Sequence, residues 1–181
     1  MRHVLRDKWL ILRFRHGSQE AFCRIYERYR DDLLRLAVSL LKDKSAAEDV
    51  VHEVFAGLIG ARQTFTLTGS LRAYLATCVV NRVRDQVRAR RRQGQAIDEE
   101  LSLESDFDPP NGRILSDERS RLVARALARL PDEQREIIAL HLNGQLKLRE
   151  IARLQGIPLT TVRGRYRHGI DRLRSILNGR L

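Results

Sequence analysis

The chain has 181 residues, which is enough for one ordinary domain or for two small helical domains. Its 34 Lys and Arg residues outnumber its 23 Asp and Glu residues, and the net charge of +11 favours a polyanionic partner, with nucleic acid as the first candidate. Cys23 and Cys78 lack CxxC spacing, so we expect two small buried thiols in a reducing compartment rather than a disulfide or a zinc site. No apolar run is as long as a membrane span, and the N-terminus is too charged for a secretory signal. We therefore expect a cytoplasmic protein without membrane insertion.

Apolar residues recur with a helical period in nearly every segment, and strand signals are nearly absent. A short helix is expected over 4–15, ended by Gly17, and Ser18 is placed to cap a long helix that reaches Leu41. Ser45 and Glu48 are spaced as a capping box for the next helix. That helix is expected to bury Val50, Val51, Val54, Phe55, Leu58 and Ile59, and to expose Glu48, Asp49, His52 and Glu53.

A Gly- and Thr-rich loop follows over 60–70, and Ser70 is placed to cap a helix that begins at Leu71 and ends in arginines. Residues 93–116 break the helical pattern with acids, Pro-Pro and Asn-Gly, which together mark a linker. We therefore predict an all-α protein of two small helical domains, residues 1–95 and 116–181, joined by a flexible acidic linker over 96–115.

The C-terminal half is expected to begin with a helix over 117–128 that turns Leu122, Val123, Ala126 and Leu127 inward. Pro131 and the acids after it start a second helix, because Pro suits a first helical turn and carboxylates suit the positive end of the helix. The Asn143-Gly144 pair is expected to end it.

Residues 148–177 have the features of a helix-turn-helix. Ala152 is the small residue required where the two helices cross, Gly156 tolerates the positive φ of the turn, and Val162 is the apolar residue that fills the crevice between the helices. The alternative is a generic helical hairpin, which needs none of these residues at this spacing.

The second helix of this motif is expected to bury Val162, Tyr166, Ile170, Leu173 and Leu177. Its exposed edges then carry Arg163, Arg167 and Asp171 on one side and Arg165, His168 and Arg172 on the other. Arginines on such a helix bind guanine edges in the major groove or clamp phosphates. A solvated basic helix is the alternative, but the acid-poor run over 160–170 argues against it, since solvated faces usually mix charges of both signs.

Several stretches together resemble one known family, the extracytoplasmic-function (ECF) sigma factors of the sigma-70 family. AEDVVHEVFAGL resembles their region 2.2, and SLRAYLATCVVNRVRDQVR resembles their regions 2.3 and 2.4. LPDEQREIIALHLNGQLKLREIARLQGIPLTTVRGRYRHGIDRLRSIL resembles their region 4. The resemblance covers most of the chain in the expected order. It implies an alternative sigma factor that binds core RNA polymerase, recognises −35 and −10 promoter elements and aids promoter opening.

The resemblance also implies partners and site residues. The core polymerase would be bound at its β′ clamp helices and β flap, and the region 2.2 residues at matching positions are Asp49, His52 and Glu53. The −10 element, with one base flipped out of the stack, would lie against Gln63, Thr64, Asn81, Arg82, Arg84 and Arg88. The −35 element would be read by Thr161, Arg163, Arg165, Arg167 and His168. An anti-sigma factor is a further candidate partner. The chain departs from the family pattern at His52, usually glutamine, and at Gly164, usually serine.

Two other classes of function remain as alternatives. A stand-alone helix-turn-helix regulator would need a dimerisation or sensing domain in the N-terminal half, and the carboxylates of Asp49 and Glu53 suit a polymerase-bound factor better. An enzyme is rejected, because the sequence has no Gly-rich phosphate loop, no metal-ligand cluster and no histidine triad. We accordingly expect no catalytic residue, no metal and no cofactor.

Overall fold

The computed structural model describes residues 2–67, 69–92, 122–123 and 125–179, and every regular element within these residues is a helix. The elements, in chain order, are α1 (Arg2–Arg15), α2 (Gln19–Leu41), α3 (Lys44–Gly60), α4 (Leu71–Arg92), α6 (Asp132–Leu142), α7 (Leu148–Gln155) and α8 (Leu159–Leu177). Residues 122–123 and 125–128 are also helical, and the rest of the helix expected over 117–128 lies outside the described residues, as does the expected linker. The all-α prediction is confirmed.

Local sequence signals set the boundary between α1 and α2. Gly17 has a φ of +90°, a left-handed conformation that stops α1 and is easiest for glycine. Ser18 then caps α2, because its Oγ accepts a hydrogen bond from the Ala21 backbone N–H at 3.3 Å. Both boundaries agree with the prediction from the sequence.

The predicted cap of α3 is wrong. Asp43, and not Ser45, is the N-cap residue, and its carboxylate accepts a hydrogen bond from the Ala46 backbone N–H at 3.1 Å. Lys42 adopts a left-handed φ of 59° at the end of α2, so the chain turns sharply there and α3 starts at Lys44, two residues earlier than a capping box at Ser45 requires. Ser45 lies within the first turn of the helix and is exposed.

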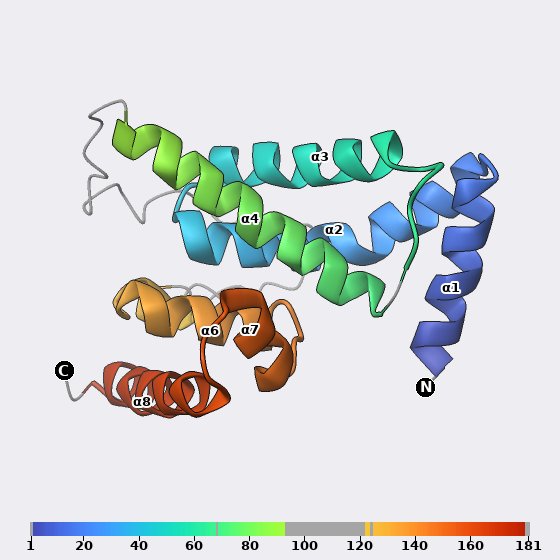
Figure 1. Ribbon diagram of the computed structural model, residues 1–181. Coiled ribbons are helices and arrows are strands. Elements are labelled where there is room, and N and C mark those ends of the chain that lie inside the picture. Colours follow the sequence, from blue (N-terminus) through green and yellow to red (C-terminus); the bar gives the residue numbers. More distant parts are fainter. Residues whose placement is uncertain (1, 68, 93–121, 124, 180–181) are drawn as a thin grey trace.

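The N-terminal helices form a bundle around α2, which packs against α1, α3 and α4 (Figure 1). Its core consists of side chains that are almost completely shielded from solvent, among them Phe14, Ile25, Leu33, Leu36, Leu58, Leu71 and Leu75. Burying an aliphatic or aromatic side chain of this size stabilises the fold by roughly 1.5–3 kcal/mol. Apart from Ile59, the residues that the sequence predicts to be buried on α3 all belong to this core: Val50, Val51, Val54, Phe55 and Leu58.

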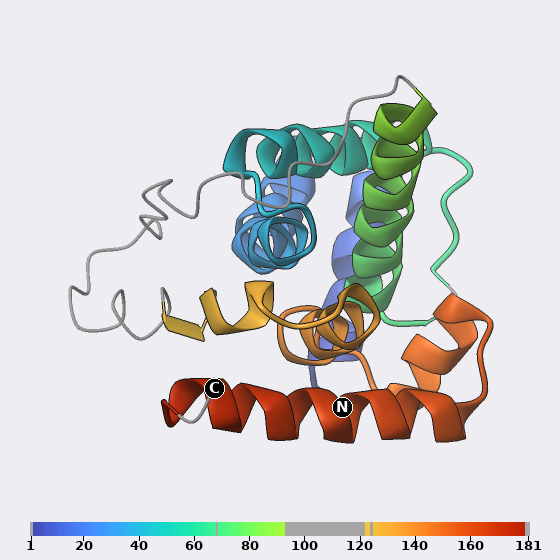
Figure 2. The same cartoon turned by 90° about the vertical axis from the view of Figure 1, so that its left-hand side faces the viewer.

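The C-terminal helices pack against this bundle through α6. Figures 1 and 2 both show α6 lying between the N-terminal bundle and α8. Ile137 and Leu140 of α6 are fully buried in the same core as Leu33 and Leu36 of α2. A second, smaller cluster fills the space between the segment before α6 and α8, and it contains Ala126, Leu127, Leu130, Ile138 and Leu173.

Several residues expected inside are exposed. Ile59 on α3 is 50% exposed, Leu177 at the end of α8 is 49% exposed, and Leu122 and Val123 also face solvent. Cys23 is exposed and Cys78 is only half-buried, so the expectation of two buried thiols is wrong for Cys23. These residues lie at the edges of apolar stripes or at helix ends, where coverage depends on the neighbouring helix rather than on periodicity. Among the described helices, none combines the length and apolar character that crossing a lipid bilayer requires.

Candidate nucleic-acid interfaces

Helices α7 and α8 form the helix-turn-helix that the sequence predicts. Gly156 ends α7 with a φ of 66°, and the Ile157 backbone N–H donates to the Ala152 carbonyl at 3.2 Å. Val162 is fully buried between the helices, and Ala152 is buried where they cross. Each of the three residues on which the motif prediction rests thus occupies its expected place.

The second helix of this motif, α8, packs against α6 on one side. Tyr166 packs edge-on against His141, with ring centroids 5.0 Å apart, and Nδ1 of His141 donates to the Leu146 carbonyl at 2.8 Å. Gly169 is buried against Ile138 of α6, where a side chain would have almost no room. The opposite side of α8 is therefore the side that DNA can approach (Figure 2).

Four of the five residues proposed to read the −35 element are exposed on α8: Thr161, Arg163, Arg167 and His168. Arg165 differs, because it is half-buried and its Nη2 lies 2.6 Å from Glu133 Oε2 of α6. An arginine bound to a carboxylate must give up that ion pair before it can bind a phosphate or a base. The sequence does not distinguish among the five residues, whereas the structure separates Arg165 from the rest.

The loop between α3 and α4 presents polar residues around a buried aromatic anchor. Gln63 and Thr64 are exposed, whereas Phe65 is buried and its ring lies 4.9 Å from that of Tyr74 on α4. The Phe65 backbone N–H donates to the Ala61 carbonyl at 2.8 Å, which closes the loop onto the end of α3. The proposed −10 residues of the loop are thus carried on a short segment that is fixed at its centre.

The arginine-rich part of α4 contains both exposed and half-buried side chains. Asn81, Arg82 and Arg88 are exposed, and Arg88 Nη1 lies 3.7 Å from Asp85 Oδ1 on the same helix. Arg84 is half-buried, and its Nη2 lies 2.8 Å from Glu136 Oε1 of α6. Sequence reasoning missed both Glu133 and Glu136 as partners of the arginines, since ion pairs between distant segments leave no local pattern in the sequence.

The face of α3 expected to bind polymerase is present. Asp49, His52 and Glu53 are all exposed, and because His52 and Glu53 lie three and four positions after Asp49, each neighbours Asp49 on the helix surface. Glu53 Oε2 lies 3.5 Å from Arg82 Nε, so the acidic face of α3 borders the basic face of α4. Among the described residues, no group of three or more His, Cys, Asp or Glu side chains has the arrangement of a metal site.

The helix-turn-helix and the basic face of α4 define a helical DNA-binding protein. A family model for sigma-70 region 2 matches residues 25–93, and a model for sigma-70 region 4 matches residues 120–173. The chain is 26% identical over 177 residues to the ECF RNA polymerase sigma factor SigW of Bacillus subtilis, covering 92% of this chain and 94% of SigW. It is 30% identical over 162 residues to the ECF RNA polymerase sigma factor RpoE of Cereibacter sphaeroides, covering 88% of this chain and 87% of that protein.

The fold is also similar to a solved structure, that of the sigma factor RpoE in complex with the anti-sigma factor NepR from Bartonella quintana. The TM-score is 0.69 at 24% sequence identity, over 87% of this chain and 96% of that one. The chain belongs to the ECF sigma factors of the sigma-70 family.

Proposed function

We propose that this alternative sigma factor divides its contacts among three surfaces. The α3 face of Asp49, His52 and Glu53 binds the β′ clamp helices of core RNA polymerase. The loop after α3 and the exposed side of α4 bind the −10 element through Gln63, Thr64, Asn81, Arg82 and Arg88, and Arg84 joins them once it leaves Glu136. The helix α8 reads the −35 element with Thr161, Arg163, Arg167 and His168, and Arg165 joins them once it leaves Glu133. The factor directs polymerase to promoters and has no catalytic site of its own.

The main support for this proposal is that negative and positive side chains lie on separate helices of the N-terminal bundle. Exposed carboxylates lie on α3 and exposed arginines lie on α4, and the two faces meet at the Glu53–Arg82 pair. The acidic face can therefore bind the basic surface of a partner protein while the neighbouring basic face binds the DNA backbone. A stand-alone DNA-binding protein has no need of the acidic face.

The domain limits predicted from the sequence, 1–95 and 116–181 with a linker over 96–115, enclose the two matched regions and form part of this proposal. We further propose that the factor acts in the cytoplasm, where core polymerase is found, and that an anti-sigma factor regulates it. Binding of NepR by the structurally similar RpoE supports the last point.

The polymerase surface is tested with an Asp49→Ala/Glu53→Ala double variant. We expect its affinity for core polymerase to fall at least about tenfold, because two interface carboxylates are lost. Glu20→Ala/Glu27→Ala is the matched control, since both residues are exposed on α2 and the net charge changes equally. Wild-type affinity in the Asp49/Glu53 variant, measured by fluorescence anisotropy with labelled sigma factor, would contradict the assignment.

A further inference from the structure

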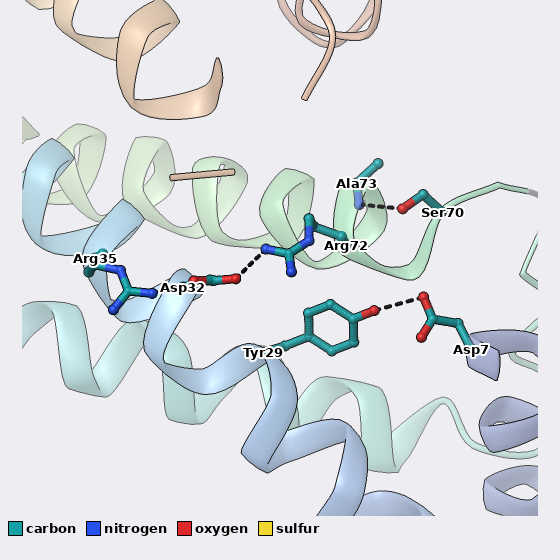
Figure 3. Close-up of polar contacts among 7 residues, drawn as sticks. All are labelled: Asp7, Tyr29, Asp32, Arg35, Ser70, Arg72 and Ala73. Atoms are coloured by element: carbon teal, nitrogen blue, oxygen red, sulfur yellow. Dashed lines mark hydrogen bonds and ion pairs between the residues drawn. The ribbon is translucent and has the colours of Figure 1, made fainter. Parts of the chain in front are cut away.

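A buried polar network links α1, α2 and the start of α4 (Figure 3). Asp7 of α1 is only 4% exposed, because it lies on the same side of the helix as the buried residues Leu10, Ile11 and Phe14. The Tyr29 hydroxyl of α2 donates to Asp7 Oδ2 at 2.7 Å, and Arg28 Nη1 lies 3.2 Å from Asp7 Oδ1. A carboxylate at such a position destabilises the fold unless it is paired, so its partners have to stay in place.

Tyr29 also contacts α4, and so links α1 to that helix. The Arg72 guanidinium lies over the Tyr29 ring, 5.2 Å from the centroid, and Arg72 Nη1 binds the carboxylate of Asp32. Burial, followed by the hydrogen bond to Asp7, raises the pKa of Tyr29 well above its usual value, so the hydroxyl stays protonated and keeps donating. Arg72 is thus held from two sides, by an aromatic face and by a carboxylate.

Arg72 is the second residue of α4 and lies two positions after the end of the loop that carries the proposed −10 residues. Ser70 Oγ accepts a hydrogen bond from the Ala73 backbone N–H at 3.5 Å, and Leu71 is fully buried, so the network and the cap fix the same turn of the helix. At the other end of the loop, the Arg62 guanidinium approaches Gly17, to within 3.6 Å of where a Cβ would lie. The loop is therefore flanked at one end by the network that reaches α1, and at the other end by Arg62 close to Gly17, the residue that stops α1.

We propose that Asp7 and Tyr29 are positioning residues for −10 recognition, through which α1 sets the placement of the loop residues Gln63 and Thr64. This inference rests on the proposed −10 site. The helix α1 lies outside the matched region 25–93, and neither Asp7 nor Tyr29 reaches the exposed surface of the loop. An apolar side chain at position 7 would fill the same space without a desolvation penalty. A buried carboxylate with directional partners instead fixes one geometry.

The test uses Tyr29→Phe, which removes one hydroxyl, and Tyr26→Phe, the matched control on the same helix. Tyr26 packs against Phe22 and Phe55, so its hydroxyl lies outside the network. Each full-length variant is assembled with core polymerase. Initial transcription rates are then compared on a promoter that the wild type transcribes and on versions with single-base changes in the −10 element. Discrimination is the ratio of these rates.

We expect Tyr29→Phe and Asp7→Asn to lower −10 discrimination about three- to tenfold, with core affinity unchanged, because a misplaced loop loses its base contacts first. Arg72→Lys, which keeps the charge beside Asp32, should retain more discrimination than Arg72→Gln. Tyr26→Phe should match the wild type. Unchanged discrimination in Tyr29→Phe would overturn the inference, and so would a parallel loss of core binding, which marks a general loss of structure.

A Gln63→Ala/Thr64→Ala variant separates this inference from the proposed function. If that variant discriminates as well as the wild type does, the proposed −10 site is wrong and the positioning role falls with it. If it loses discrimination and Tyr29→Phe does not, the −10 site stands and the positioning role alone is refuted.

Discussion

Two glycines on α8 are expected to respond in opposite ways to the same substitution. A Cβ at Gly169 would lie 2.6 Å from Ile138 Cδ1 and 3.3 Å from Gln134 Cβ, whereas a Cβ at Gly164 meets no atom within 4 Å. Ile138 is fully buried among Ala126, Leu127 and Leu173, so it has little room to move away. The contact between α6 and α8 thus requires glycine at position 169 and not at position 164.

The magnitudes follow from two effects. Replacing a helical glycine with alanine stabilises the fold by about 0.5–1 kcal/mol, and this gain is common to both sites. Overpacking costs about 1–3 kcal/mol and applies to Gly169→Ala alone. The two variants should therefore differ in free energy of unfolding by about 1–3 kcal/mol, with Gly164→Ala more stable than the wild type and Gly169→Ala less stable or equal to it.

Urea unfolding followed by circular dichroism measures this difference. With an m-value of about 2 kcal/mol per molar urea, the two midpoints should lie about 0.5–1.5 M apart. Because the substitution and the helix are the same, helix propensity cancels in the comparison. A Gly169→Ala variant at least as stable as Gly164→Ala would refute the packing of α6 on α8 described above.

Two further outcomes are expected. Arg163→Ala should reduce the slope of log affinity against log salt by about 0.9 for DNA binding by the free chain, whereas Arg84→Ala should reduce it less, because the Arg84 guanidinium is bound to Glu136. Equal reductions in fluorescence anisotropy titrations would contradict the pairing. Iodoacetamide should modify exposed Cys23 before Cys78, since burial raises the pKa of the Cys78 thiol and lowers its reactive thiolate fraction. Peptide mass spectrometry after partial alkylation gives the order, and faster modification of Cys78 would contradict it.

Features that depend on one or two neighbouring residues could be predicted from the sequence. Ser18 caps α2 and Gly156 ends α7 because the side chain or the backbone freedom of a single residue decides each boundary. The cap of α3 was predicted wrongly because Asp43 and Ser45 are both able to cap a helix. The left-handed turn at Lys42, which favours Asp43, has no glycine to reveal it.

Features that depend on distant segments could not be predicted. The sequence around Arg84 and Arg165 does not distinguish them from their neighbours Arg82 and Arg163. In the fold, however, α6 places a carboxylate beside Arg84 and another beside Arg165. The network around Asp7 could not be predicted either, because it joins residues from three separate helices, α1, α2 and α4. One signal for it was available, since an acidic residue on the apolar side of a predicted helix must find a buried partner.

Run-off transcription with purified core polymerase on genomic fragments distinguishes a sigma factor from a stand-alone regulator in a single assay. We expect discrete transcripts that require this chain and that disappear when Arg163 and Arg167 are both replaced by alanine. Transcription that is the same with and without the chain, on fragments that the chain nevertheless binds, would contradict it and would favour a stand-alone regulator.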